Sequence, residues 1–192
     1  FLKEANAGRR DRITGTVAVI GGGGVAFDCA FTARRLGAKA VHILCVEKAG
    51  EMCAGPDDLR QGREEGLTVH NGTMVSRLLP GRSGPAGVEF FEITGFHFDE
   101  CRNLTVQPLS DRKKTLEADT VISAVGVEPD LSGIDPRNLL KRTARGTLEV
   151  HPLTLATSLD GVFAAGDAVT GPGTVAQAVG SDEKPGAAAD KP

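Results

Sequence analysis

In the first third of the chain, the apolar positions alternate between short continuous runs and runs at helical spacing. The continuous runs are bounded by glycine, proline or charged residues, which is typical of buried parallel strands; they lie at 16–20, 40–46 and 67–70. The runs at helical spacing, and a charged stretch that opens with proline, predict helices at 25–36 and 56–65. An order of strand, helix, strand, helix and strand specifies a parallel sheet with right-handed crossovers.

After residue 70 the pattern changes. Three β-like segments separated by Gly, Pro and Asn turns predict an antiparallel meander at 74–79, 88–98 and 104–108. A further continuous apolar run at 120–125 predicts another buried strand. For the remaining chain we expect a loop, a short β pair at 148–150 and 162–165, and a helix that begins near Thr174. The polar segment at 1–13 is expected to be a loop.

The strongest chemical signal is the turn between the first predicted strand and the first predicted helix. It fits the pattern G-x-G-x-x-G/A through Gly21, Gly23 and Ala26. Gly21 allows the tight turn, Gly23 lets the backbone approach a pyrophosphate, and Ala26 permits close packing of helix on strand. Exposed N–H groups at the helix start then bind the anion. We therefore predict a dinucleotide-binding turn, with the candidate residues Gly21, Gly22, Gly23, Gly24, Val25 and Ala26; the alternative is a glycine-rich turn without a ligand.

Two charged residues follow the second predicted strand. Glu47 lies at about the 20-residue offset expected for an acid that binds the ribose hydroxyls, and a carboxylate there repels a 2′-phosphate. Alone it favours NAD(H), but the adjacent Lys48 could partly accommodate that phosphate, and a solvated surface pair is the other interpretation. Asp28, in the first turns of the helix, either contacts the nicotinamide end or is a helix-surface acid.

Composition narrows the function classes. Hydrophobic residues make up 40%, charged residues 24%, and the net charge is −3, which describes a globular protein without a large basic surface. With eight Phe and no Trp or Tyr, nucleic-acid binding by aromatic stacking is not expected. No apolar run approaches bilayer length, and no signal-peptide pattern opens the sequence. The four cysteines lack C-x-x-C spacing, so we expect reduced thiols in a cytoplasmic protein, with no metal or iron–sulfur site built from this chain alone.

Several stretches, in order along the chain, resemble the glutamate synthase small (beta) subunit family. They are the glycine turn with Asp28, the acidic region at 51–54 and 63–66, the strand region at 118–126, and the tail at 157–175. The resemblance implies a flavoprotein electron-transfer module that passes hydride from NAD(P)H to FAD. It places Ala124, Val125 and Gly126 at the last nucleotide-domain strand.

The same resemblance implies a flavin-binding role for the tail. Asp167, after Gly166, would hydrogen-bond the flavin ribityl chain, and the helix start at Thr174 and Val175 would face the isoalloxazine ring. The predicted fold class is therefore α/β: a Rossmann-like NAD(P)-binding domain with an inserted antiparallel β-meander, followed by the C-terminal portion of a FAD-binding domain. Its expected limits are 1–15 for a leading segment, 16–128 for the nucleotide domain and 129–192 for the flavin portion.

This sequence also departs from the family pattern. The upstream FAD fingerprint and the cysteine-rich iron–sulfur domain are missing, so we expect an incomplete FAD site, completed by the rest of a longer protein or by another subunit. Glu47 follows Val46 where the family often has an arginine pair for NADPH, Gly24 replaces its usual Asn, and Pro185 should end the last helix early.

The functional prediction is the NAD(P)H-binding portion of a flavin-dependent oxidoreductase. Hydride transfer between two cofactors needs positioning and no side-chain acid or base, so no catalytic residue is predicted. The alternative is a module that binds the dinucleotide without turnover and acts in interaction or regulation. A thioredoxin-reductase-like enzyme is disfavoured because C-x-x-C is missing.

Overall fold

The computed structural model describes residues 1–82, 84–99, 103–126, 130–135, 137–144, 146–171 and 173. The chain divides into two compact units. Unit 1 comprises Phe1–Phe98 and Leu104–Gly126, and unit 2 comprises Asp99–Asn103 and Val127–Pro192. No helix in the described part of either unit is long and apolar enough to cross a membrane.

A four-stranded parallel sheet forms the centre of unit 1. Its order is β3-β2-β1-β7, with bounds Thr68–His70, Ala40–Leu44, Thr16–Ile20 and Thr120–Ser123. The predicted α/β class and each of the four strands are confirmed. Strand β2 ends at Leu44, two residues earlier than expected, because the next backbone groups bond to the segment after β3: the Thr73 N–H donates to Cys45 O at 2.8 Å.

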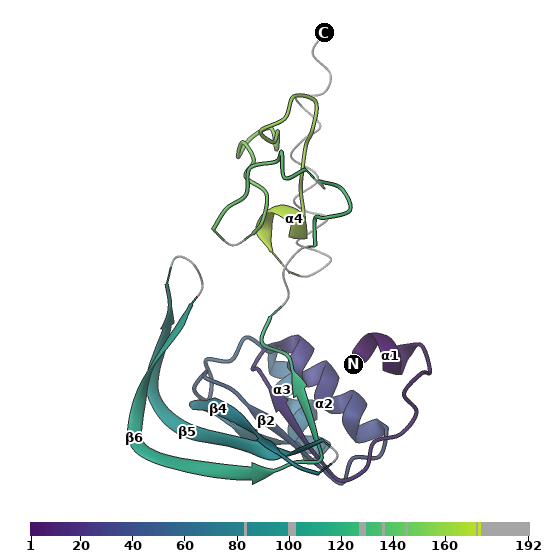
Figure 1. Ribbon diagram of the computed structural model, residues 1–192, viewed down its shortest axis with the longest axis vertical. Coiled ribbons are helices and arrows are strands. Elements are labelled where there is room, and N and C mark those ends of the chain that lie inside the picture. Colours follow the sequence, from purple (N-terminus) through teal and green to yellow (C-terminus); the bar gives the residue numbers. More distant parts are fainter. Residues whose placement is uncertain are drawn as a thin grey trace. The chain divides into compact units, whose positions relative to one another are not determined.

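The helices cover one face of this sheet (Figure 1). Helix α2 (Gly24–Arg35) and helix α3 (Pro56–Glu64) form where the spacing predicted them. The buried face of α2 packs on β1 and β2, where Val17, Val19 and Ile43 are fully buried. The expectation of a loop over 1–13 is wrong in part: residues Leu2–Asn6 form a one-turn helix, α1, and Leu2 packs against this core.

The opposite face of the parallel sheet is covered by a second, antiparallel sheet (Figure 1). Its order is β4-β5-β6, with bounds Thr73–Pro80, Pro85–Phe98 and Leu104–Glu117. Because side chains alternate between faces, Ala18 and Leu44 point away from the helices and pack against Val88 and Phe90 of β5. The predicted meander is confirmed, but β6 continues to Glu117 instead of ending near Pro108.

A pair of histidines lies beside this second core. His42 Nδ1 and His70 Nε2 are 3.1 Å apart, and the His70 ring also contacts Phe90. Burial lowers the pKa of both imidazoles, and His70 is lowered further by His42 and Lys114. Neutral rings can pack between two sheets without the cost of desolvating a charge.

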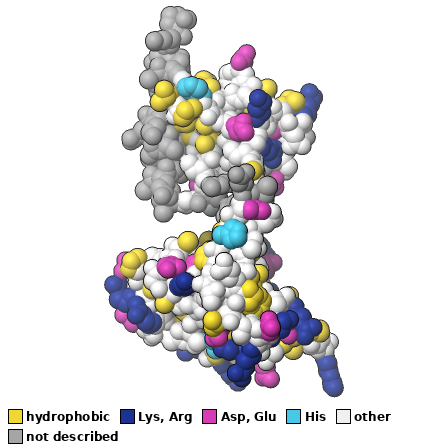
Figure 2. Space-filling model, turned by 90° about the vertical axis from the view of Figure 1, so that its left-hand side faces the viewer, with side chains coloured by type: hydrophobic (Ala, Val, Ile, Leu, Met, Phe, Trp, Pro, Cys, Tyr) yellow, Lys and Arg dark blue, Asp and Glu magenta, His cyan; other side chains and the backbone are white. Residues whose placement is uncertain are grey.

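The outer face of the antiparallel sheet carries charges of both signs, as the space-filling view of that side shows (Figure 2). Glu89 of β5 is nearly buried and is paired from both neighbouring strands. Arg77 of β4 lies 3.3 Å from its carboxylate and Lys113 of β6 lies 2.9 Å away, while Ser76 donates a further hydrogen bond. These contacts tie the three strands of the antiparallel sheet together.

Unit 2 has its own small core, formed by Leu131, Leu140 and Leu148. The expected pairing of 148–150 with 162–165 is wrong: Leu148 bridges to Arg142, and Phe163 bridges to Ala156. Each bridge joins two residues that are close in the sequence, so each closes a short local loop. The four-residue helix α4 (Asp167–Thr170) was not predicted, and the helix expected near Thr174 lies outside the described residues.

Candidate functional site

The glycine turn lies at the carboxyl end of the parallel sheet, between the ends of two neighbouring strands. The Gly21 N–H donates to Leu44 O at the end of β2, and the Ala124 N–H after β7 donates to Ile20 O at the end of β1. This edge of an open parallel sheet is where such folds bind ligands. The turn therefore occupies the position at which the sequence places it.

The first two glycines of the turn are required by their protein neighbours. Gly21 has φ +132°, which L side chains rarely adopt, and a Cβ on it would overlap the carbonyl oxygen of Ala124. Gly22 has no such backbone constraint, but a Cβ there would overlap Oε2 of Glu47 and lie 3.0 Å from the Cβ of Cys45. Both positions are closely packed in the protein itself.

The next two glycines face open space. A Cβ on Gly23 or Gly24 would meet no atom within 4 Å. Gly23 caps helix α2 with φ −91° and ψ 176°, an extended conformation open to any residue. The first N–H groups of α2, at Gly24 and Val25, have no intrahelical acceptor. An accessible backbone with unpaired N–H groups at a helix start suits an anion such as a pyrophosphate. In contrast, Ala26 is fully buried in the core between α2 and the sheet.

The side chain of Glu47, from the loop after β2, lies against this turn. Its backbone is held by the loop after β3, because its carbonyl oxygen accepts the Gly72 N–H at 2.9 Å and Asn71 Nδ2 at 3.3 Å. Its side chain lies over Gly22, and Oε2 is buried without a hydrogen-bond partner among the described residues. A buried carboxylate oxygen that lacks a donor is unfavourable. A ligand hydroxyl at this position would satisfy it, so the residues present fit the ribose of a dinucleotide.

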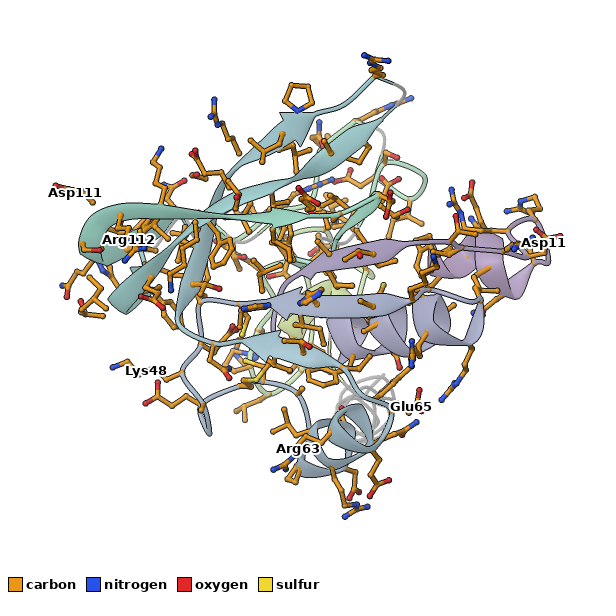
Figure 3. The ribbon with its side chains drawn as sticks, turned by 90° about the horizontal axis from the view of Figure 1, so that it is seen from below. Asp11, Lys48, Arg63, Glu65, Asp111 and Arg112 are labelled. Carbon is orange, nitrogen blue, oxygen red and sulfur yellow. The ribbon has the colours of Figure 1, made fainter. Side chains whose placement is uncertain are left out.

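The positive residues considered for a 2′-phosphate do not pair with Glu47. Lys48 is exposed and points outward from the loop after β2, and Arg63 lies on α3 (Figure 3). Arg60 binds Asp57 at 2.8 Å, and Arg63 Nε donates to Leu59 O. None of the ion pairs among the described residues involves Glu47.

Two apolar side chains border the turn. Val25, in the first turn of α2, is 48% exposed, and Val125, just after β7, is 72% exposed. Ala124 packs against the helix-side core, while Gly126 has φ +137° and nothing within 4 Å of its Cβ position. Asp28 is exposed on α2, one turn after Gly24. Val25 and Val125 therefore offer exposed apolar surface near the carboxyl ends of β1 and β7.

The candidate flavin residues belong to unit 2. Gly166 has φ 61° and ψ −148°, a conformation confined to glycine, and it precedes α4. Asp167 is exposed, and its carboxylate makes no hydrogen bond within the described residues. A hollow of about 100 Å³ lies beside them, lined by Leu155, Phe163, Ala164 and Ala165. It is smaller than the roughly 300 Å³ or more of a typical ligand pocket. Thr174 and Val175 lie outside the described residues.

Residues that no sequence motif marks hold Glu47 in place. Cys45 is buried, and its Sγ lies 3.5 Å from Asn71 Nδ2, which donates to it. Burial and then the charge of Glu47 raise the pKa of the Cys45 thiol to about 12, so it stays protonated. Ala54 donates its N–H to Gly22 O at 3.2 Å. No motif marks these contacts, since they join segments that meet only after folding. The described residues contain no cluster of three or more side chains suited to a metal ion.

The chain is similar to several known proteins. A family model described as "Pyridine nucleotide-disulphide oxidoreductase" matches residues 1–181. The NADP(+)-dependent formate dehydrogenase subunit beta of Moorella thermoacetica is 34% identical over 192 residues, which cover 100% of this chain and 27% of that protein. The glutamate synthase [NADPH] small chain of Azospirillum brasilense is 35% identical over 168 residues, covering 85% of this chain and 34% of that protein.

The fold also resembles a solved structure. The crystal structure of T. acidophilum thioredoxin reductase superposes with a TM-score of 0.68 at 23% identity, covering 88% of this chain and 50% of that one. This likeness concerns the fold alone. The chain spans between about a quarter and a third of the length of the curated relatives named above.

Proposed function

This chain belongs to the pyridine nucleotide-disulphide oxidoreductase family, and we propose that its unit 1 binds NAD(P)H and positions it for hydride transfer to FAD. Homologues of the chain include the small chain of a glutamate synthase and the beta subunit of a formate dehydrogenase. The proposal therefore concerns the nucleotide-binding part of an oxidoreductase.

One observation supports the proposal above all others. Next to the closely packed Gly21 and Gly22, the turn has an open backbone at Gly23 and Gly24, and an unsatisfied carboxylate oxygen of Glu47 borders it. A glycine is not needed at position 23 by the fold, because neither its dihedral angles nor its neighbours forbid a side chain. A ligand that approaches the backbone closely explains this glycine.

In the proposed complex, each part of the turn has a separate task. The N–H groups at Gly23, Gly24 and Val25 bind the pyrophosphate. Glu47 accepts hydrogen bonds from the adenosine ribose hydroxyls, which gives a modest preference for NADH over NADPH because a carboxylate repels a 2′-phosphate. The two relatives named above carry NADP(H) in their names, so this preference would distinguish the present chain from them.

The nicotinamide would extend toward the carboxyl ends of β1 and β7. Val25 and Val125 offer exposed apolar surface there, and Asp28 lies one turn further along α2. When bound, NAD(P)H would supply the hydride and the flavin would accept it. The protein's contribution is orientation and the exclusion of water, without a side-chain acid or base.

For the flavin, we propose that unit 2 supplies one wall of the site. Asp167, with Gly166 before it, offers a free carboxylate for the ribityl hydroxyls, and Thr174 and Val175 are assigned to the same wall by family resemblance. The remaining wall would come from the rest of a longer protein or from another subunit. The relatives' names, "subunit beta" and "small chain", agree with a multi-subunit enzyme.

A substitution at Gly23 tests nucleotide binding. We expect Gly23→Val to abolish binding of NADH in calorimetric titration, because the branched side chain fills the space that the pyrophosphate would take. The loss of a glycine helix cap costs about 1 kcal/mol, so circular dichroism and thermal unfolding should still show a folded protein. Gly23→Ala should weaken binding less than Gly23→Val. A folded Gly23→Val variant with wild-type affinity for NADH would refute the proposed site.

A further inference from the structure

We infer that Gly22 determines nucleotide preference by leaving room for the Glu47 carboxylate. This inference rests on the proposed function, because it concerns how the same turn distinguishes NADH from NADPH. The task of Gly22 is then separate from that of Gly21, which shapes the turn, and from that of Gly23, which lets the pyrophosphate approach the backbone.

The contact between Gly22 and Glu47 is close. A Cβ on Gly22 would overlap Oε2 of Glu47 and lie 2.9 Å from its carboxylate carbon. Gly22 has no positive φ, so its backbone does not require glycine. Since Gly22 is itself buried, a methyl group there has no other direction in which to avoid the carboxylate. The neighbouring side chain explains this glycine.

The end of the Glu47 side chain can change rotamer, whereas its backbone is held by hydrogen bonds. Asn71 and Gly72 donate hydrogen bonds to the Glu47 carbonyl oxygen, and the Cβ of the buried Cys45 lies beside Gly22. A methyl group at position 22 would therefore turn the end of the Glu47 side chain outward and leave the loop in place. The methyl carbon at position 22 would lie 3.0 Å from the Cβ of Cys45, and this contact requires Cys45 to shift by only a few tenths of an ångström.

The position of the carboxylate decides what it can bind. While it lies over Gly22, Oε2 is next to the turn and lacks a donor. Displaced from the turn, it loses the ribose hydroxyls as partners and lies further from a 2′-phosphate. NADH would lose its hydrogen bond to the Glu47 carboxylate, and the 2′-phosphate of NADPH would no longer be repelled by that carboxylate.

A double-mutant cycle on the full chain tests this inference, with NADH and NADPH affinities measured by calorimetry. We expect Gly22→Ala to lower NADH affinity about tenfold, the size of one hydrogen bond to a carboxylate, and to leave NADPH affinity unchanged or higher. Glu47→Ala should change the ratio of the two affinities in the same direction. In the Glu47→Ala background, Gly22→Ala should change the ratio no further, because the carboxylate that it displaces is gone.

Gly24→Ala is the matched control, since its Cβ meets no atom within 4 Å. It can weaken both nucleotides equally, but it should preserve their ratio. If Gly22→Ala is too unstable alone, the Glu47→Ala background relieves the overlap, and the ratio in the double variant is compared with that of Glu47→Ala.

Three outcomes overturn the inference. In the first, folded Gly22→Ala keeps the wild-type ratio of NADH to NADPH affinity while Glu47→Ala changes that ratio. This result would show that Gly22 does not position the carboxylate. A further change of ratio in the double variant would show that Gly22 acts on the nucleotide independently of Glu47. Failure of the wild-type chain to bind either nucleotide would refute the proposed function and this inference with it.

Discussion

Four adjacent glycines in one turn have different neighbours, so substitutions at them should have different consequences. Gly21 is fixed by its backbone conformation and Gly22 by the Glu47 side chain, whereas Gly23 and Gly24 face open space. Motif spacing alone predicts the roles of Gly21 and Gly23. It could not predict the contact of Gly22 with Glu47, because that contact depends on how the loop after β2 folds back over the turn.

At the residue scale, replacement of Glu47 by arginine tests nucleotide preference. A carboxylate within about 4 Å of a phosphate meets repulsion of roughly 4 kcal/mol per charge pair at an effective dielectric of 20. Glu47→Arg removes this repulsion and adds a donor for the 2′-phosphate. We expect the modest preference for NADH to narrow or reverse, as measured by titration of both nucleotides.

The exposed Lys48 provides a comparison for that substitution. Its side chain points outward, so Lys48→Ala should change the preference much less than Glu47→Arg. Tighter NADPH binding by the wild type, unchanged in Glu47→Arg, would show that Glu47 does not face the ribose.

At the scale of elements, the sequence predicts a strand where apolar residues cluster. Strand β1 is predicted with its observed bounds because its side chains are buried by layers on both faces. The second half of β6 is almost entirely polar and exposed, so apolar alternation could not reveal it. Backbone pairing with β5 and ion pairs such as Lys113 with Glu89 support it instead. Helix α1 was missed because a single turn is too short to show a period.

Glu89 gives the antiparallel sheet a pH dependence. The hydrogen bond from Lys113 and then that from Ser76 lower the pKa of this carboxyl, with a further contribution from Arg77. Its ionised form is therefore stabilised by folding. That stability is fully present above the ordinary Glu pKa of 4.5 and is lost as pH falls through the lowered folded value. We expect Glu89→Gln to lower the melting temperature at pH 7, with a difference from wild type that shrinks below about pH 4.

Glu92 of the same strand is the control, because its ion pair with Lys114 is exposed. Surface ion pairs contribute about 0–1 kcal/mol, so Glu92→Gln should change the melting temperature at pH 7 less than Glu89→Gln does. Equal melting temperatures for Glu89→Gln and the wild type at pH 7 would contradict the role assigned to Glu89.

At the scale of the whole molecule, the two units differ in how completely the sequence determines them. Unit 1 has two apolar cores, one on each face of its parallel sheet, and its architecture follows from periodicity and turn signals. Unit 2 has a small core, and large side chains such as Ile134 and Leu153 are exposed. Its strand pairing was predicted wrongly because isolated bridges between short loops leave little periodic signal.

The last prediction concerns the flavin. Among the described residues, one turn of the G-x-G-x-x-G/A form joins a strand to a helix, at Gly21, Gly23 and Ala26, and the proposed nucleotide site uses it. The pyrophosphate of FAD would need a second such turn. Among the described residues of unit 2, the hollow near Gly166 and Asp167 measures about 100 Å³, below the roughly 300 Å³ of a typical ligand pocket. We therefore expect the purified 192-residue chain to be colourless and to contain far less than one FAD per chain.

Absorbance spectra and chromatography of the cofactor released by heat measure this content. NADH binding by the same sample serves as the internal control, because it shows that unit 1 is folded while flavin is missing. Supplying the absent part of the site, as a longer protein or a partner subunit, should then restore flavin binding. That recovery should depend on Asp167, so Asp167→Ala should weaken FAD retention in the completed protein without changing NADH affinity in the 192-residue chain. Full flavin absorbance in the isolated chain, with no copurifying protein, would contradict the division of the flavin site proposed above.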